Sequence, residues 1–169
     1  MANELKTKRD ALIQDAIAKE PCINSAKKLI LKICVIFLSA RLIFSIVETV
    51  YVLNRGLPIS SCVINYVMLG VGALFALGIY KQGIKALTYL AIAGGALTIL
   101  NLQKTDFIAN FQMGDSFYNL YVITLIVAMI IQILSMLLIL LNGNCKKYFS
   151  EITRINKTVT GQGNGGALK

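Results

Sequence analysis

Arg41 and Glu48 are the charged residues that interrupt the first long apolar run of the sequence, residues 33–53. Ser45 and Glu48 follow Arg41 at spacings of four and three, which places the three side chains on one face of a helix. Arginine does not lose its proton in proteins, so a guanidinium at this depth needs a carboxylate, backbone carbonyls or water around it. The pattern therefore predicts a polar seam inside a bundle of apolar helices.

A matching polar stripe follows the last apolar run, residues 117–141. Thr124, Gln132 and Ser135 recur there at helical spacing, with Ala128 between the first two. Polar and charged residues inside membrane helices usually mark a path for ions or substrates. The alternative is a buried network that only fixes how the helices pack. The predicted intramembrane polar face comprises Arg41, Ser45, Glu48, Thr124, Gln132 and Ser135.

Residues for other kinds of chemistry are missing from the sequence. The chain has no histidine, and its four cysteines contain no CxxC pair, which excludes zinc sites of the usual spacing and histidine-based triads. No Gly-rich phosphate loop occurs either. We expect no catalytic residue, no metal and no cofactor, and hence a protein that is not an enzyme.

The composition predicts the elements that position these residues. Hydrophobic residues make up 56% of the 169 and charged residues 15%, and only eight charges fall between Ile33 and Leu141. Four apolar stretches reach about the 20 residues that a membrane helix needs. We expect an all-α integral membrane protein, a four-transmembrane-helix bundle, in the domain at 29–145. Its spans are expected at 33–53, 59–80, 84–102 and 117–141.

The distribution of Lys and Arg predicts the orientation. Fourteen of the 17 basic residues lie in the N-terminal arm, in the turn at 81–85 or in the tail, and the opposite side holds only Arg55 and Lys104. Positive residues favour the cytoplasmic face, so both termini are expected in the cytoplasm and the chain in the plasma (inner) membrane of a bacterium. The net charge of +9 then reflects topology and attraction to the lipid bilayer, and no nucleic-acid partner is expected.

The two ends of the chain are expected to differ in order. Residues 1–28 form a predicted cytoplasmic amphipathic arm, with a helix that stops before Pro21 and either lies on the inner leaflet or docks to a partner. Its apolar face comprises Leu5, Leu12, Ile13, Ala16 and Ile17. The basic segment 146–169 ends in a run rich in Gly and Asn, and we expect it to be a flexible cytoplasmic tail.

The longest connection between spans combines aromatic and acidic residues. Phe107 and Phe111 are one helical turn apart, and Asp106 and Asp115 lie nearby. The aromatic residues fit a belt at the outer membrane interface. A sharper interpretation is a vestibule in which carboxylates concentrate cations, since an oligomer would turn two acidic residues per chain into a ring.

Small residues in the two middle spans predict close helix packing. Gly72 and Ala76, and likewise Ala91 and Gly95, form small-xxx-small pairs. Such pairs let helix backbones approach closely, within one chain or between subunits.

Together these features predict a non-enzymatic multi-pass membrane protein. Its polar intramembrane face is expected to form a channel- or transport-type pathway in a homo-oligomer or a membrane protein complex. The alternative is a membrane-anchored interaction protein, an accessory or immunity-type subunit whose polar groups only specify assembly.

Overall fold

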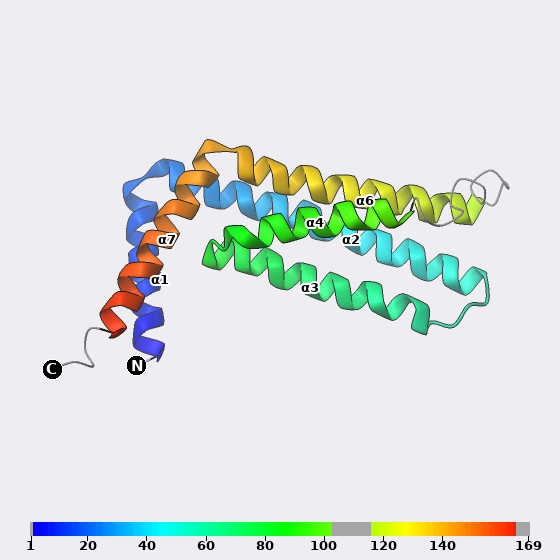
Figure 1. Ribbon diagram of the computed structural model, residues 1–169, viewed down its shortest axis with the longest axis horizontal. Helices are drawn as coiled ribbons and strands as arrows, with labels where there is room; N and C mark the ends of the chain where they lie inside the picture. Colours follow the sequence, from blue (N-terminus) through cyan, green and yellow to red (C-terminus); the bar gives the residue numbers. More distant parts are fainter. Residues whose placement is uncertain (1, 103–115, 165–169) are drawn as a thin grey trace.

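The computed structural model describes residues 2–102 and 116–164, and every regular element in these ranges is a helix. The helices are α1 (Ala2–Lys19), α2 (Pro21–Asn54), α3 (Ser60–Gln82), α4 (Lys85–Leu102), α6 (Ser116–Leu141) and α7 (Gly143–Asn164). Helices α2, α3, α4 and α6 run alongside one another, whereas α1 and α7 lie side by side at one end and point away from them (Figure 1). The prediction of an all-α chain is confirmed for the described residues.

Three of the described helices are long and apolar enough to cross a membrane. They are α2, the Cys62–Gln82 part of α3, and α6, while α4 carries a shorter apolar stretch over Lys85–Leu100. The main contacts join α2 to α6, α6 to α4, and α3 to both α2 and α4. Among these four, each helix therefore packs on two of the others, and α2 contacts α6, which is distant in the sequence.

Helix α2 begins twelve residues before the predicted span. Pro21 opens it at the first helical position, where the missing N–H costs nothing and the fixed φ suits a helix. Its first turns bury Ile23, Ala26 and Ile30 on one side. Lysines on the other side separate this stretch from the apolar run at 33–53, although one helix carries both.

The small residues predicted for helix packing lie at contacts within the chain. A side chain at Gly72 would meet the ring of Phe37 on α2 at 3.2 Å, and one at Gly95 would meet Ile133 on α6 at 3.0 Å. Ala76 and Ala91 are both buried. These residues therefore let α3 approach α2 and α4 approach α6, rather than joining α3 to α4.

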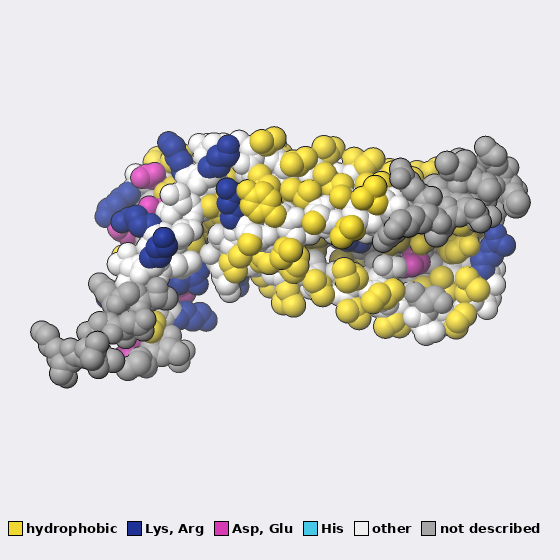
Figure 2. Space-filling view, in the orientation of Figure 1, with side chains coloured by type: hydrophobic (Ala, Val, Ile, Leu, Met, Phe, Trp, Pro, Cys, Tyr) yellow, Lys and Arg dark blue, Asp and Glu magenta, His cyan; other side chains and the backbone are white. Residues whose placement is uncertain are grey.

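Large apolar side chains cover the outside of the helices that run together. Leu74 on α3, Leu97 on α4 and Leu141 on α6 keep 68%, 60% and 72% of their surface exposed. Figure 2 shows apolar side chains over this part of the molecule and Lys and Arg gathered where α1 and α7 lie. An exposed apolar surface of this extent needs a covering, such as lipid.

Helix α7 corrects the prediction of a flexible tail. Asn142 accepts hydrogen bonds at Oδ1 from the backbone N–H groups of Asn144 and Cys145, so it caps the first turn. From there a stripe of buried residues follows one face of the helix: Cys145, Tyr148, Phe149, Ile152, Ile155 and Val159. The Gly-rich end has no apolar residues to bury, but this stripe does, and its burial stabilises α7 over residues 143–164.

The partner of α7 is α1, and this contact accounts for the amphipathic face predicted in the arm. Ile13 is 7% exposed and shares one core cluster with Ile152, Ile155 and Val159, while Leu5, Leu12, Ala16 and Ile17 pack at its edge. The arm's apolar face is thus covered by α7 of the same chain. We call α1 and α7 together the terminal helix pair.

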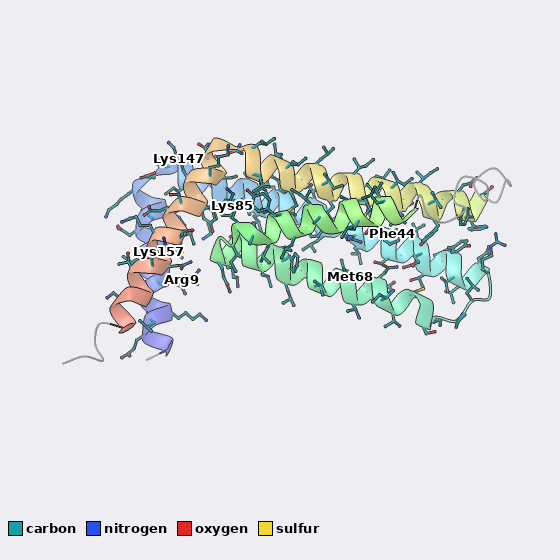
Figure 3. All side chains as sticks on the ribbon, in the orientation of Figure 1. Arg9, Phe44, Met68, Lys85, Lys147 and Lys157 are labelled. Atoms are coloured by element: carbon teal, nitrogen blue, oxygen red, sulfur yellow. The ribbon has the colours of Figure 1, made fainter. Side chains whose placement is uncertain are left out.

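The terminal helix pair is attached to the carboxyl end of α3. Tyr148 Oη donates to the carbonyl of Tyr80 at 2.6 Å, and Arg9 Nη2 donates to that of Lys81 at 3.1 Å. Arg9 Nε also donates to Asn156 Oδ1 at 2.8 Å and so ties α1 to α7. The last carbonyls of a helix have no hydrogen-bond donor within the helix, and Tyr148 and Arg9 supply donors for α3. In Figure 3, Arg9, Lys147 and Lys157 lie at this end, and Phe44 and Met68 lie far along the other helices.

Candidate functional site

The candidate site is the polar seam, which we define as Arg41, Glu48, Asn65 and Gln132 together with the backbone carbonyl of Ala91. These groups come from α2, α3, α4 and α6, so every helix of the apolar part contributes to it. Gln132 and Glu48 are 3% and 7% exposed, and Arg41 is half-buried. The surroundings are apolar, with Phe37 and Phe44 buried one turn to either side of Arg41.

Gln132 links three helices through its amide. Arg41 Nε donates to Gln132 Oε1 at 2.9 Å, and Gln132 Nε2 donates to the carbonyl of Ala91. Gly95 lies one turn beyond Ala91 on the same face, and a side chain there would come within 3.3 Å of Gln132 Nε2. The absence of a side chain at Gly95 therefore makes room for the amide between α4 and α6.

The guanidinium of Arg41 uses only part of its hydrogen-bonding capacity. An arginine has five N–H donors, and Nε is the one bonded to another described residue. The only buried polar atom without a partner among the described residues is Asn119 Oδ1, so the two Nη groups of Arg41 are not sealed in the protein. They keep some accessible surface, where water, a ligand or another subunit can accept from them.

Glu48 is bonded to α3. Asn65 Nδ2 on α3 donates to Glu48 Oε2, and no salt bridge joins Glu48 to Arg41 in the described part of the chain. Next to this pair, Thr49 Oγ1 and Tyr66 Oη lie 2.9 Å apart. The seam therefore has two branches from α2, with Arg41 turned toward α6 and Glu48 turned toward α3.

The other predicted members of the polar face form local bonds only. Ser45 Oγ donates to the carbonyl of Arg41 at 3.0 Å and Thr124 Oγ1 to that of Leu120 at 2.7 Å, both one turn back on their own helix. Ser135 is half-buried on α6. The structure thus brings Arg41 and Gln132 together directly, whereas no hydrogen bond between the described helices involves the side chain of Thr124 or Ser135.

Aromatic residues close the end of the seam that lies away from the terminal helix pair. Tyr51 on α2 stacks on Tyr121 of α6 with ring centroids 5.1 Å apart, and Phe44 lies 5.7 Å from Tyr121. The predicted acidic and aromatic residues of the connection after α4, Asp106, Phe107, Phe111 and Asp115, lie outside the described residues. Tyr51 was absent from the predicted set because its role depends on α6.

Two groups of the seam gain their importance only in three dimensions. The Ala91 carbonyl has no signature in the sequence, and Asn65 had a clear polar identity but no visible partner. Across the residues that the structure describes, no three His, Cys, Asp or Glu side chains are grouped to hold a metal ion, and the cysteines are free thiols. The arrangement can therefore bind and orient polar groups through hydrogen bonds and one fixed positive charge.

Comparison with known proteins gives no further guide, because no family model, no curated protein and no solved structure matches this chain.

Proposed function

We propose that the protein is a multi-pass membrane protein in which α2, α3, α4 and α6 cross the bilayer as a four-helix bundle. Their exposed apolar surfaces support lipid contact, and α4 with 18 residues is about 27 Å long, close to the thickness of the hydrocarbon core. Both termini emerge at the end that carries the terminal helix pair and most of the basic residues (Figure 2). Because basic residues favour the cytoplasmic face, this distribution supports cytoplasmic termini and a plasma (inner) membrane location.

Within this frame we propose that the polar seam carries a channel- or transport-type pathway. The observation behind this proposal is Arg41, whose Nε is bonded to Gln132 while its Nη groups keep access to space outside the chain. At the middle of an apolar bundle such donors need water or an anionic or carbonyl-bearing group nearby. A hydrated crevice, or a passing solute with acceptor oxygens, satisfies this need.

An oligomer fits the same observation. A guanidinium at the surface of the bundle would otherwise face lipid. A neighbouring copy stabilises it by shielding both the guanidinium and its water from the lipid. In such an assembly the Arg41 side chains of several copies would face a common path. The pathway is then a property of the homo-oligomer or complex.

The alternative function is that of an accessory or immunity-type interaction subunit. It is favoured by the pairing of Glu48 with Asn65 and of Gln132 with Ala91, because such satisfied bonds fix packing without any transport. In this case the Nη groups of Arg41 bind a partner helix. The two functions differ in whether solutes cross the membrane.

Reconstitution of the full chain in liposomes separates the two. If the seam is a pathway, the wild-type protein passes ions or small anions above the background of empty vesicles, and Arg41→Leu changes that flux. Lys32→Gln is the matched control, since it removes one positive charge from an exposed position of the same helix, outside the seam. Its flux is expected to equal that of the wild type.

The oligomeric state in mild detergent completes the test. Flux at background for the wild type, with Arg41→Leu altering only the assembly, contradicts the pathway and supports the interaction subunit. Failure of the chain to insert into bilayers at all would overturn both functions.

A further inference from the structure

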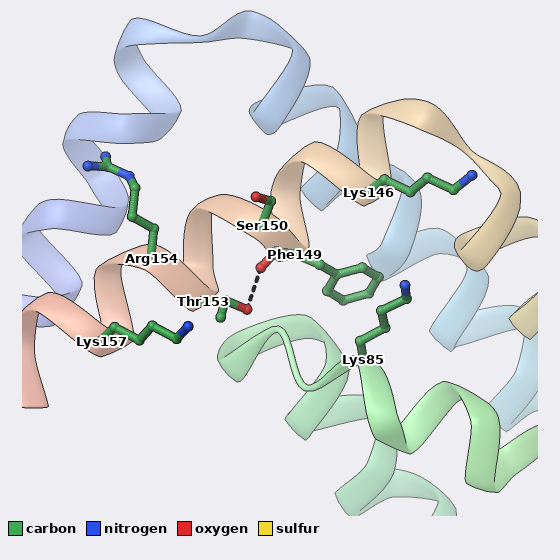
Figure 4. A pocket seen from close by; sticks show the side chains of 7 residues that line it. All are labelled: Lys85, Lys146, Phe149, Ser150, Thr153, Arg154 and Lys157. Carbon is green, nitrogen blue, oxygen red and sulfur yellow. Dashed lines mark hydrogen bonds between the residues drawn. The ribbon is translucent and has the colours of Figure 1, made fainter.

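A basic groove lies where α7 passes the beginning of α4, outside the polar seam. It is open, has a volume of about 520 Å³, and is lined by Lys85 of α4 and by residues of α7 between Lys146 and Lys157. Figure 4 shows Lys85 of α4 and Lys146 of α7 extending beside the ring of Phe149, with Lys157 further along α7. The groove thus brings Lys85 together with residues of α7 that are 61 or more positions away in the sequence.

The charges of the groove are all positive. Its lining contains Lys85, Lys146, Arg154 and Lys157 and no carboxylate. Arg154 donates through Nε to Glu151 at 2.9 Å and turns away from the Phe149 ring in Figure 4. The carboxylate of Glu151 therefore balances its charge. The guanidinium also holds the pKa of the Glu151 carboxyl below its usual range. Lys85 and Lys146, which lie beside the Phe149 ring, attract an anion next to the positive end of the α4 helix dipole.

The walls of the groove are partly apolar, and this decides which anion fits. Phe149 is the apolar residue of the lining. Outside the groove, Tyr89 and Leu90 in the next turn of α4 are 53% and 56% exposed. The Nζ of Lys85 lies 5.7 Å from the centre of the Tyr89 ring. A free phosphate would use only the lysines, whereas a phospholipid would use the lysines for its phosphate and the apolar surface for its acyl chains.

We infer that this groove is a binding site for an anionic phospholipid of the inner leaflet, with its phosphate between Lys85 and Lys146. The inference rests on the proposed membrane placement, in which the start of α4 lies at the cytoplasmic interface. Anionic headgroups are attracted to clustered lysines at this depth. A bound lipid would then bridge the bundle and the terminal helix pair, because Lys85 belongs to one and Lys146 to the other.

The test compares two double variants of the full-length protein in nanodiscs that contain phosphatidylcholine with or without phosphatidylglycerol. Lys85→Gln with Lys146→Gln removes the groove charges. Lys6→Gln with Lys28→Gln removes the same total charge from exposed positions of α1 and α2. The lipid that stays bound to the protein is quantified by native mass spectrometry after transfer to detergent.

Wild type and control are expected to retain phosphatidylglycerol over phosphatidylcholine, and the groove variant to lose about tenfold in retention. Equal loss in both variants, or no loss in either, overturns the site. Inorganic phosphate alone, added to the detergent-solubilised protein, is the second arm. If it displaces the lipid completely, the site recognises free phosphate and the lipid assignment is wrong.

Failure of this inference is distinguishable from failure of the proposed function. A chain that inserts into nanodiscs but binds lipid independently of Lys85 and Lys146 contradicts the groove alone. A chain that does not insert contradicts the membrane placement. Equal helical content of both variants by circular dichroism guards against a loss caused by misfolding.

Discussion

Helices α2, α3, α4 and α6 and the terminal helix pair use polar groups in opposite ways. In the apolar bundle, few polar side chains occur, and Arg41, Gln132, Glu48 and Asn65 are bonded across helices in apolar surroundings. In α1 and α7, polar residues cover the outside, and the contact between the two helices is made by Ile13, Ile152 and their neighbours. The first region is apolar outside and polar at its centre, and the second is the reverse.

This difference shows which interactions decide the stability of each region. The hydrophobic effect stabilises the terminal helix pair, because the contact between the two helices removes their apolar faces from water. In lipid that force between helices is absent, and close backbone contact and hydrogen bonds hold helices together. The seam is therefore expected to be sensitive to single polar deletions, and the pair to changes at its contact with α3.

The largest effect is expected for Gln132→Leu. The substitution leaves Arg41 Nε and the Ala91 carbonyl without their partner in apolar surroundings, at a cost of about 3 kcal/mol in the free energy of unfolding. Unfolding in mixed detergent, followed by circular dichroism, measures it.

Thr124→Val is the matched control for that substitution on the same helix. Valine has nearly the size of threonine, so the substitution removes only a hydroxyl, which bonds to the carbonyl of Leu120. We expect a change below about 0.5 kcal/mol. If both variants lose the same stability, the seam has no special role in holding the helices together.

A smaller effect is expected at Gly83, where the turn after α3 meets the terminal helix pair. Gly83 has φ +62°, and a Cβ there would lie 2.8 Å from Ile152 Cγ2 on α7. Gly83→Ala therefore adds backbone strain of about 1–2 kcal/mol and also pushes α7 away. We expect faster proteolysis of α7 together with a loss of about 2 kcal/mol in unfolding free energy.

Gly56→Ala isolates the strain from the contact. Gly56 has nearly the same φ of +63°, but a Cβ there meets nothing within 4 Å. Its variant should lose about 1 kcal/mol and leave the proteolysis of α7 unchanged. Equal proteolysis rates in the two variants would mean that Gly83 does not hold α7 in place.

The comparison also explains which parts of the structure the sequence could predict. The apolar runs and the isolated Arg41 are local signals, and the runs correctly indicated helices. Partner choice depends on how helices are arranged, so the sequence could not assign Gln132 to Arg41 or Asn65 to Glu48. The prediction of four membrane crossings remains a prediction.

The error at the two ends of the chain had a single cause. The buried stripe Cys145, Tyr148, Phe149, Ile152, Ile155 and Val159 has helical spacing, and Asn142 precedes it as a cap, so the signal for α7 was present. The Gly-rich residues after it outweighed this signal, and the arm was then left without a partner. An amphipathic segment at each end of a chain should first be tested as a pair.

The smallest effect is expected for Tyr148→Phe, which tests how α7 is held on α3. Tyr148 is 1% exposed, and its hydroxyl donates to the Tyr80 carbonyl, so its loss should cost about 1 kcal/mol at neutral pH. Tyr89→Phe is the control, because Tyr89 is half exposed on α4 and its ring contact with Lys85 persists in the variant.

The pH dependence of this loss gives a sharper test than its size. Burial, with a smaller contribution from Tyr80 and an opposing one from Arg9, raises the pKa of Tyr148 to about 12, against about 10 in an unfolded chain. Between these values the unfolded chain releases the proton while folded Tyr148 retains it, so wild-type stability falls as pH rises. The Tyr148→Phe variant has no such proton to release. The stability difference between wild type and variant should therefore shrink above about pH 10 and change sign before about pH 12. A difference that stays constant over this range would mean that the Tyr148 hydroxyl is accessible to water and does not fasten α7 to the end of α3.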